Sequence, residues 1–307
     1  MQYVIRRLLQ TFIVIFGVSV FSFGLMFLTG DPAEVLLGEG ANYMTQEQIE
    51  AYRHLKGFDR PWYIQYLDFA SKAIQGDFGQ SFRYHQPALQ VVVQRFPATL
   101  QLAAVALAIS VVIGIPAGVL SATRPNTGVD YLSTLVALIG QSVPSFWLGI
   151  MLMLILGVWL RLLPISGRGD WRNLLMPGFT LAAFSLARNM RLTRSSLLDV
   201  IQQDYVRTAR AKGLPESRVI YLHALRNALL PVVTAVGLQL GFLLGGSVII
   251  ETVFAWPGVG RLIIDAIYNK DFPLVQAGVT LLATAFTLVN LGVDLLYSWI
   301  DPRIRYG

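Results

Sequence analysis

The residue types that most often carry out catalysis are sparse in this sequence, and their spacing matches no familiar reaction centre. The three histidines are His54, His85 and His223; they lie far apart, without H-E-x-x-H spacing and without any cysteine. We therefore expect no metal site. No G-x-x-x-x-G-K-[ST] loop is present to bind nucleotide phosphates through backbone N–H groups, and no serine has an identifiable base. The sequence predicts no catalytic residue and no cofactor in this chain, so if ATP is used, with its Mg²⁺, another chain must bind it.

Polar residues inside long apolar runs are the next candidates. Gln141, Ser142, Gln239 and Asn290 stand in such runs and could either line a hydrated path across a membrane or form hydrogen bonds between helices. Asp294 lies in or near the membrane, where an ionisable group is costly and is a functional candidate. Proton coupling through Asp294 would make the chain an ion-coupled secondary transporter. Its place near the end of a run favours an interfacial salt bridge.

A basic stretch at residues 204–231 separates two uncharged runs and predicts a helix, a glycine turn and a second helix. Residues 197–212 contain good helix formers and no proline, Gly213 can end a helix with positive φ, and Pro215 suits the first turn of the next helix. Small residues are expected to leave a low surface at this corner, namely Ala209, Ala211 and Gly213. Positive charges surround it at Arg207, Arg210, Lys212 and Arg218. Such a corner could dock into a cleft of another protein, or be a plain basic loop or a DNA-binding helix-turn-helix.

The composition indicates a membrane protein. Of 307 residues, 54% are hydrophobic and only 14% are charged, whereas about a quarter are charged in ordinary soluble domains. Apolar runs that approach or exceed the ~20 residues needed to cross a bilayer predict six spans. They cover residues 8–30, 96–123, 131–160, 173–187, 227–250 and 272–293.

The six spans divide the chain into four parts. Residues 1–30 form a tail and an uncleaved first span, and residues 31–95 form a small extracytoplasmic subdomain. Residues 96–300 form a five-helix core with a cytoplasmic loop at 191–226, and residues 301–307 form a cytoplasmic tail. Pro144 interrupts the third run, which predicts one tilted or broken helix. The fourth run has just 15 uncharged residues, so its helix must continue through Arg188 to span a membrane.

The charge distribution predicts the orientation. Six spans place both termini on one side, which then holds 13 basic and five acidic residues, against 11 basic and 12 acidic residues on the other, and Asp294 near the end of the last span completes the count. Basic residues favour the cytoplasmic side. Both termini and the basic stretch are therefore expected in the cytoplasm. This asymmetry explains the net charge of +6 without nucleic-acid binding.

Several motifs resemble permeases of ATP-binding cassette importers, in the dipeptide, oligopeptide and nickel branch. The segment YVRTARAKG, followed by HALRNALLP, resembles the EAA loop of that family, although Arg207-Thr208-Ala209 stands in place of Glu-Ala-Ala and Arg226 in place of proline. The first-loop segments GDP, FDRPWYIQY and GDFGQS and the terminal DPRIRYG also resemble this branch. The resemblance implies a coupling helix that docks on an ATPase subunit. Its residues here would be Arg207, Ala209, Arg210, Lys212, Gly213, Leu214, Pro215 and Glu216.

A second motif, ETVFAWPGVGRL at residues 251–262, resembles the E-x-x-F-x-x-P-G-x-G-x-L signature of the same branch. Proline and glycine favour a turn, and aromatic residues prefer a membrane interface. We expect a short segment at the external mouth, or an ordinary aromatic anchor. Its residues are Glu251, Phe254, Trp256, Pro257 and Gly258.

Gly237, Gly241 and Gly245 recur every four residues and would share one face of the fifth span. A face of small residues allows close approach of helices in lipid. The partner would be either another helix of this chain or a second permease subunit.

The resemblance implies an all-α, type I ABC importer permease of the bacterial inner membrane. Its expected partners are a second homologous permease, two cytoplasmic ATP-binding subunits, an extracytoplasmic solute-binding protein and membrane lipid, but no nucleic acid. The solute would be a peptide or a similar small molecule, and glutathione, nickel chelates and opines remain open. The alternatives are the ion-coupled transporter using Asp294 and a membrane-anchored assembly protein.

Overall fold

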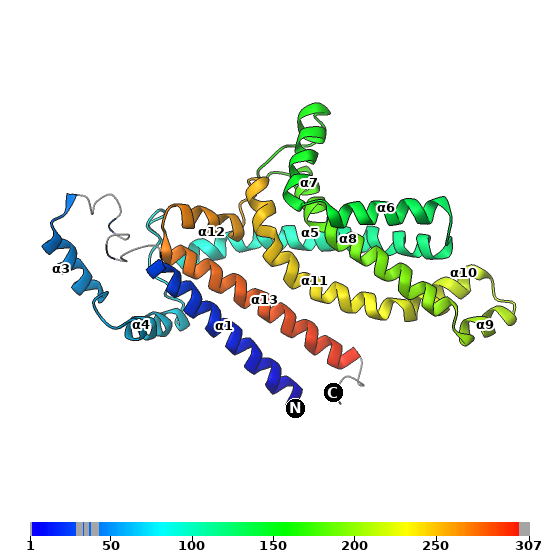
Figure 1. The fold of residues 1–307 in the computed structure, drawn as a ribbon, viewed down its shortest axis with the longest axis horizontal. Coiled ribbons are helices and arrows are strands. Elements are labelled where there is room, and N and C mark those ends of the chain that lie inside the picture. Colours follow the sequence, from blue (N-terminus) through cyan, green and yellow to red (C-terminus); the bar gives the residue numbers. More distant parts are fainter. Residues whose placement is uncertain (1, 29–32, 34–36, 38–42, 301–307) are drawn as a thin grey trace. The chain divides into compact units, whose positions relative to one another are not determined.

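A computed structural model describes residues 2–28, 33, 37 and 43–300 of the chain. Within this part the regular structure is helical, and extended pairing is limited to an isolated bridge between Gln80 and Pro87. The predicted all-α architecture is confirmed (Figure 1). The GDP motif at residues 30–32 and the terminal residues 301–307 lie outside the described residues.

The long helices are α1 (Gln2–Leu28), α5 (Ala88–Thr123), α8 (Arg172–Ile201), α11 (Leu225–Val253) and α13 (Phe272–Ile300). Shorter helices connect them. They are α3 (Gln46–Lys56), α4 (Trp62–Ile74), α6 (Gly128–Ser142), α7 (Ser145–Leu152), α9 (Asp204–Ala211), α10 (Glu216–Arg218) and α12 (Val259–Tyr268). Two π-helical segments, η2 (Met153–Trp159) and η3 (Val219–Ala224), continue α7 and precede α11.

Four of the described helical segments are long and apolar enough to cross a membrane: Arg6–Met26, Ala88–Thr123, Glu216–Val253 and Phe272–Asp294. They correspond to the predicted first, second, fifth and sixth spans. The third run is two helices, Gly128–Ser142 and Ser145–Trp159, bent by 107°. Pro144 precedes α7 as its N-cap residue, where the missing N–H of proline costs nothing. The prediction of a broken helix in this run is confirmed, and a single straight helix is excluded.

The fourth run lies within α8, which continues beyond Arg188 to Ile201 as expected and includes Pro177. This helix of 30 residues is long enough to cross a membrane but is less apolar than the other four. Its polar residues include Asn189 and Thr193, which are buried inside the chain. The six-span count therefore stays a prediction.

The chain divides into two compact units: Met1–Pro97 with Gly258–Leu291, and Ala98–Pro257 with Gly292–Gly307. The first unit has two hydrophobic clusters. One joins α5 to α12 and α13 through residues such as Val92, Leu262 and Leu274. The other joins α1, α4 and α13 through Phe23, Tyr66 and others.

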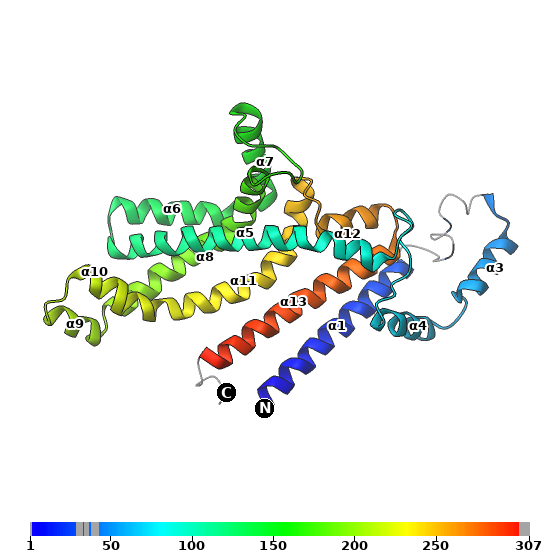
Figure 2. The ribbon, with the colours of Figure 1, turned by 180° about the vertical axis from the view of Figure 1, so that it is seen from behind.

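The second unit is built around α8, which packs against α6, α7 and α11 (Figures 1 and 2). It also meets α5 at two glycines four residues apart. A Cβ atom at Gly114 would lie 2.8 Å from the carbonyl oxygen of Leu186, and one at Gly118 would lie 2.5 Å from that of Met190. Only glycine allows this approach of the two backbones. This contact holds α8, the helix that leads into the basic corner, against α5.

Candidate functional site

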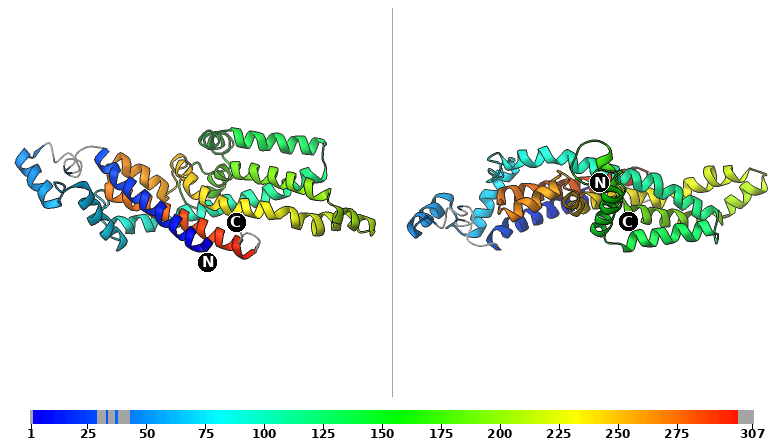
Figure 3. Two further views of the ribbon diagram at one scale, coloured as in Figure 1. Left: turned by 60° about the horizontal axis from the view of Figure 1, so that its bottom comes forward. Right: turned by 90° about the horizontal axis from the view of Figure 1, so that it is seen from above.

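The basic corner is the turn between α9 and α10, which lies at the far ends of α8 and α11 in every view (Figures 1 to 3). Helix α9 ends at Ala211 with Lys212 as its C-cap residue, and Gly213 then takes φ +75° as expected. Pro215, with φ −60° and ψ 142°, is the N-cap residue of α10 rather than part of its first turn. The sequence therefore folds locally into the helix, glycine turn and helix that it predicts.

Most of the predicted coupling residues are exposed on this corner. Leu214 is half-buried, and it packs against the hydrophobic cluster that includes Val206, Val219 and Ala228. A Cβ atom at Gly213 would meet no other group within 4 Å, so the space in front of the turn is open. The exposed residues are Arg207, Arg210, Lys212, Gly213, Pro215 and Glu216.

The position of Ala209 differs from the prediction that it forms part of the low outer surface of the corner. It is 8% exposed and belongs to the same internal cluster as Val206 and Val219. Because α9 is amphipathic, positions 206 and 209 face inward on the same side of the helix. The small size of Ala209 is therefore explained by packing within this chain. The low outer surface of the corner comes from Ala211 and Gly213, which are exposed.

One ion pair closes the corner. The Arg210 guanidinium donates to the Glu216 carboxylate, with NH2–Oε1 at 2.7 Å and Nε–Oε2 at 3.1 Å. This hydrogen bonding raises the pKa of Arg210. Arg207 and Asp204 approach to 3.7 Å. Lys212 and Arg218 form no ion pair with any described residue, so they leave the corner positively charged.

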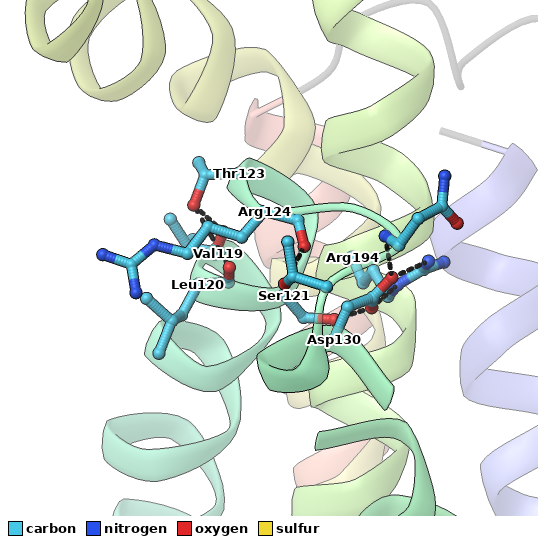
Figure 4. A network of polar contacts seen from close by, with 9 residues as sticks. Val119, Leu120, Ser121, Thr123, Arg124, Asp130 and Arg194 are labelled. Carbon is cyan, nitrogen blue, oxygen red and sulfur yellow. Dashed lines mark hydrogen bonds and ion pairs between the residues drawn. The ribbon is translucent and has the colours of Figure 1, made fainter. Parts of the chain in front are cut away.

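Sequence reasoning missed a second polar group, shown in Figure 4. Asp130, 3% exposed in the first turn of α6, accepts two hydrogen bonds from Arg194 of α8, at 2.7 Å from Nε and 2.8 Å from NH2. Ser121 Oγ donates to the same carboxylate at 2.5 Å, and the backbone N–H of Asn126 donates at 3.0 Å. The turn between α5 and α6 is thereby joined to α8, the helix that precedes the corner. In the sequence Asp130 is a single acidic residue next to a short turn, and this pattern does not predict its pairing with Arg194.

The residues proposed for a hydrated path have different partners. Gln239 of α11 and Asn189 of α8 exchange two amide hydrogen bonds, of 2.6 Å and 3.1 Å, and both are buried. Gln141 accepts a 2.6 Å hydrogen bond from Arg191 and is half-buried, whereas Ser142 is exposed. Of the two roles predicted for Gln239, the structure shows the hydrogen bond between helices. Asn290 differs, because its Oδ1 is buried and has no hydrogen-bond partner among the described residues.

The residues expected at an external mouth are mostly buried. Phe254 and Trp256 are 2% and 1% exposed, which corrects their interpretation as interfacial anchors. Trp256 Nε1 donates to the carbonyl of Ala98 at 2.9 Å, and the buried Glu251 accepts from Thr99 at 2.8 Å. Pro257 is half-buried, and Gly258 is the N-cap residue of α12. The motif therefore fastens the end of α11 to α5.

The three glycines of α11 do not share one environment. Gly237 is half-buried, Gly241 is buried and Gly245 is exposed. A Cβ atom at Gly245 would meet nothing within 4 Å. Close helix contact is instead found at Gly114 and Gly118 of α5, a pair of the same spacing that the sequence also contains.

Comparison with known proteins places this arrangement among transport components. The family model described as "Binding-protein-dependent transport system inner membrane component" matches residues 114–306, and its N-terminal counterpart matches residues 1–103. The glutathione transport system permease protein GsiC of Escherichia coli (strain K12) is 43% identical over 307 residues, covering 100% of this chain and 99% of that protein. The dipeptide transport system permease protein DppB of Alkalihalophilus pseudofirmus is 39% identical over 335 residues, covering both chains completely.

Two solved structures share the fold. An inward-facing MetNI methionine ABC transporter matches with a TM-score of 0.57 and 22% identity, over 70% of this chain and 98% of that chain. An amino acid ABC transporter crystallised with histidines matches with a TM-score of 0.54 and 16% identity, over 70% and 94%. At these identities the likeness concerns the fold alone.

Proposed function

The chain belongs to the binding-protein-dependent transport system inner membrane components, the permeases of ABC importers, and we propose that it carries small peptides from a solute-binding protein into the cytoplasm. Two similar permeases are named for glutathione, a modified tripeptide, and for dipeptides. A peptide of two or three residues fits both. The substrate class of this chain is proposed on that basis.

The coupling to ATP is proposed to run through the α9–α10 corner. The observation that carries this proposal is the exposed turn at Gly213, open in front and flanked by the unpaired cations Lys212 and Arg218. A rigid, positively charged projection is suited to a complementary groove on an ATPase subunit. ATP binding would bring two such subunits together and move the corner, and α8 and α11 would carry that movement into the bundle.

The assembly proposed around this chain contains a second homologous permease, two ATP-binding subunits with their ATP and Mg²⁺, and the solute-binding protein. The chain itself would contribute the path and the transmission, with hydrolysis on the ATP-binding subunits. We propose that both termini and the corner lie in the cytoplasm, following the excess of basic residues on that side. Residues 31–95 would then face the solute-binding protein.

The test is reconstitution. This chain and its partner subunits in lipid vesicles should import a radiolabelled tripeptide only when ATP and the solute-binding protein are both present. Import driven by a proton gradient without ATP would instead favour the ion-coupled alternative based on Asp294. The isolated chain should hydrolyse no ATP once contaminating ATPases are removed.

A further inference from the structure

The first compact unit contains a cavity of about 760 Å³ that none of the features above uses. This volume lies within the ~300–1,000 Å³ of typical small-ligand sites. Its walls come from the end of α1, one residue of α3, the segment joining α3 to α4, helix α4, the loop after α4 and the start of α13. Helices α1 and α13 lie side by side within this unit (Figures 1 and 3). The cavity is partly open to the exterior.

Part of the wall is aromatic and rigid. Phe23, Phe69 and Phe272 line the cavity and belong to, or pack on, the cluster that joins α1, α4 and α13. Phe23 and Phe69 stack with ring centroids 5.5 Å apart. Next to them, Ser81 Oγ donates to the buried Asp271 carboxylate at 2.5 Å, which fixes the loop after α4 to the start of α13. The aromatic surface is therefore present before any ligand enters.

A side-chain amide in the wall has no hydrogen-bond partner among the described residues. Gln276 is 6% exposed and lines the cavity, yet it forms no hydrogen bond with any described residue. The amide N and O atoms of Gln276 are not themselves fully buried, so they are accessible to a ligand that has its own donor and acceptor. A peptide bond provides both.

A free cation stands at the same cavity. Arg60 lines it and forms no ion pair with any described residue. Its guanidinium lies across Gly57, where a Cβ atom would be 3.4 Å from Arg60 Nε. Gln65 holds this loop by donating to the carbonyls of Phe58 and Arg60 at 3.1 Å and 2.7 Å. Lys72, the other cation in the wall, is already paired with Asp68 at 2.9 Å. Asp77 also lines the cavity, and its Oδ1 accepts a hydrogen bond from the N–H of Gly79 at 2.9 Å. Arg60 is therefore the cation of the wall that is available to a ligand carboxylate.

From these observations we propose that the cavity is a second peptide site of this permease, which binds a short peptide by its C-terminal carboxylate. Arg60 binds the carboxylate, Gln276 pairs with one peptide group, and a side chain of the peptide packs on the phenyl rings. A lipid tail fits less well, because it would leave the Gln276 amide without partners. The inference rests on the proposed function for its choice of a peptide.

The experiment uses the purified complex of this chain with its permease and ATPase partners, without solute-binding protein and without ATP. The probe is a tritiated tripeptide with a benzophenone on its middle residue, compared with the same peptide as its C-terminal amide. We expect photo-cross-links at residues 58–82 or 272–276, and about tenfold weaker binding of the amide, as the loss of a charge-assisted pair predicts.

The variants assign the contacts. Arg60→Gln should abolish the difference between the carboxylate and the amide, whereas Arg83→Gln, which removes the same charge from a residue outside the cavity wall, should keep it. Gln276→Leu should weaken both forms, whereas Gln90→Leu on the exposed surface of α5 should weaken neither.

Equal binding of the two forms to the unmodified complex would overturn the proposal, as would cross-links confined to other residues. Retention of a phospholipid that the peptide does not displace would also overturn it. If the cavity fails in this way while vesicles still import the tripeptide, the proposed function stands without the second site. If vesicles import no peptide at all, the proposed function itself fails.

Discussion

Asp130 and Arg194 are joined by two parallel hydrogen bonds, so that the first turn of α6 is held against α8 by a paired carboxylate and guanidinium (Figure 4). The acid is buried and the Arg194 side chain is 30% exposed. Breaking such a pair leaves a buried charge without a partner, which costs about 3–5 kcal/mol at fully buried sites. The partial exposure of Arg194 reduces the expected cost to about 2 kcal/mol.

We therefore expect Arg194→Gln to lower the thermal stability of the purified permease. The double variant Arg194→Gln with Asp130→Asn should recover part of the loss, because it removes the unpaired charge. A matched control is Arg188→Gln, which changes an exposed arginine of the same helix. Equal unfolding temperatures for Arg194→Gln and the unmodified protein would mean that the pair contributes nothing.

The contact between α5 and α8 makes Gly118 intolerant of any side chain. A methyl group there would lie 2.5 Å from the carbonyl of Met190 and 2.7 Å from Cβ of Thr193. Overpacking of this kind costs about 1–3 kcal/mol. Gly118→Ala should lower the unfolding temperature, whereas Gly128→Ala, where nothing lies within 4 Å, should leave it unchanged or raise it. If both variants unfold alike, the helices can separate at no cost and the packing argument is wrong.

The amide pair between Asn189 and Gln239 predicts a non-additive result. Asn189→Leu should cost roughly 1–3 kcal/mol of stability, because it leaves the buried Gln239 amide without that partner. Adding Gln239→Leu should cost less than the sum of the two single changes. Strict additivity in a double-mutant cycle, measured by thermal unfolding in detergent, would show that the two side chains do not interact.

The orientation can be tested because the chain contains no cysteine. A cysteine at Gln75, exposed at the end of α4, should react with an impermeant thiol reagent in intact cells. One at Ser217, exposed on the corner, should react only after the membrane is opened. The reverse pattern of labelling would place the corner outside the cell and rule out its contact with a cytoplasmic ATPase.

Much of the fold is predictable from the sequence because its main signals are local. An uncharged run longer than ~20 residues defines a span wherever it occurs, and a glycine followed by proline defines the turn at Gly213. These signals place α1, α5, α11 and α13 and the corner correctly. They depend on no contact with another part of the chain.

What sequence reasoning missed depends on pairing between distant residues. The burial of Trp256 requires the carbonyl of Ala98, which lies 158 positions earlier. The polar residues of α8 look unsuitable for a membrane span in the sequence. In the structure Asn189 is hydrogen-bonded to Gln239, and Arg194 to Asp130. From the sequence Ala209 is expected on the outer surface, because its inward direction depends on how α9 packs against η3 and α8. None of these partners can be chosen from spacing alone.

The most direct test of the account is ATP hydrolysis stimulated by the loaded solute-binding protein, measured in vesicles together with ATPase retention and peptide uptake. Gly213 has φ +75° with open space around it, so a change there strains the turn by about 1 kcal/mol without disturbing the core. Asparagine tolerates this conformation and valine does not. We predict that Gly213→Val assembles with the second permease but loses stimulated hydrolysis and uptake, whereas Gly213→Asn and the exposed control Ser217→Ala keep most of both. Uptake by Gly213→Val at the unmodified rate, with normal ATPase retention, would contradict the claim that this corner couples the permease to ATP.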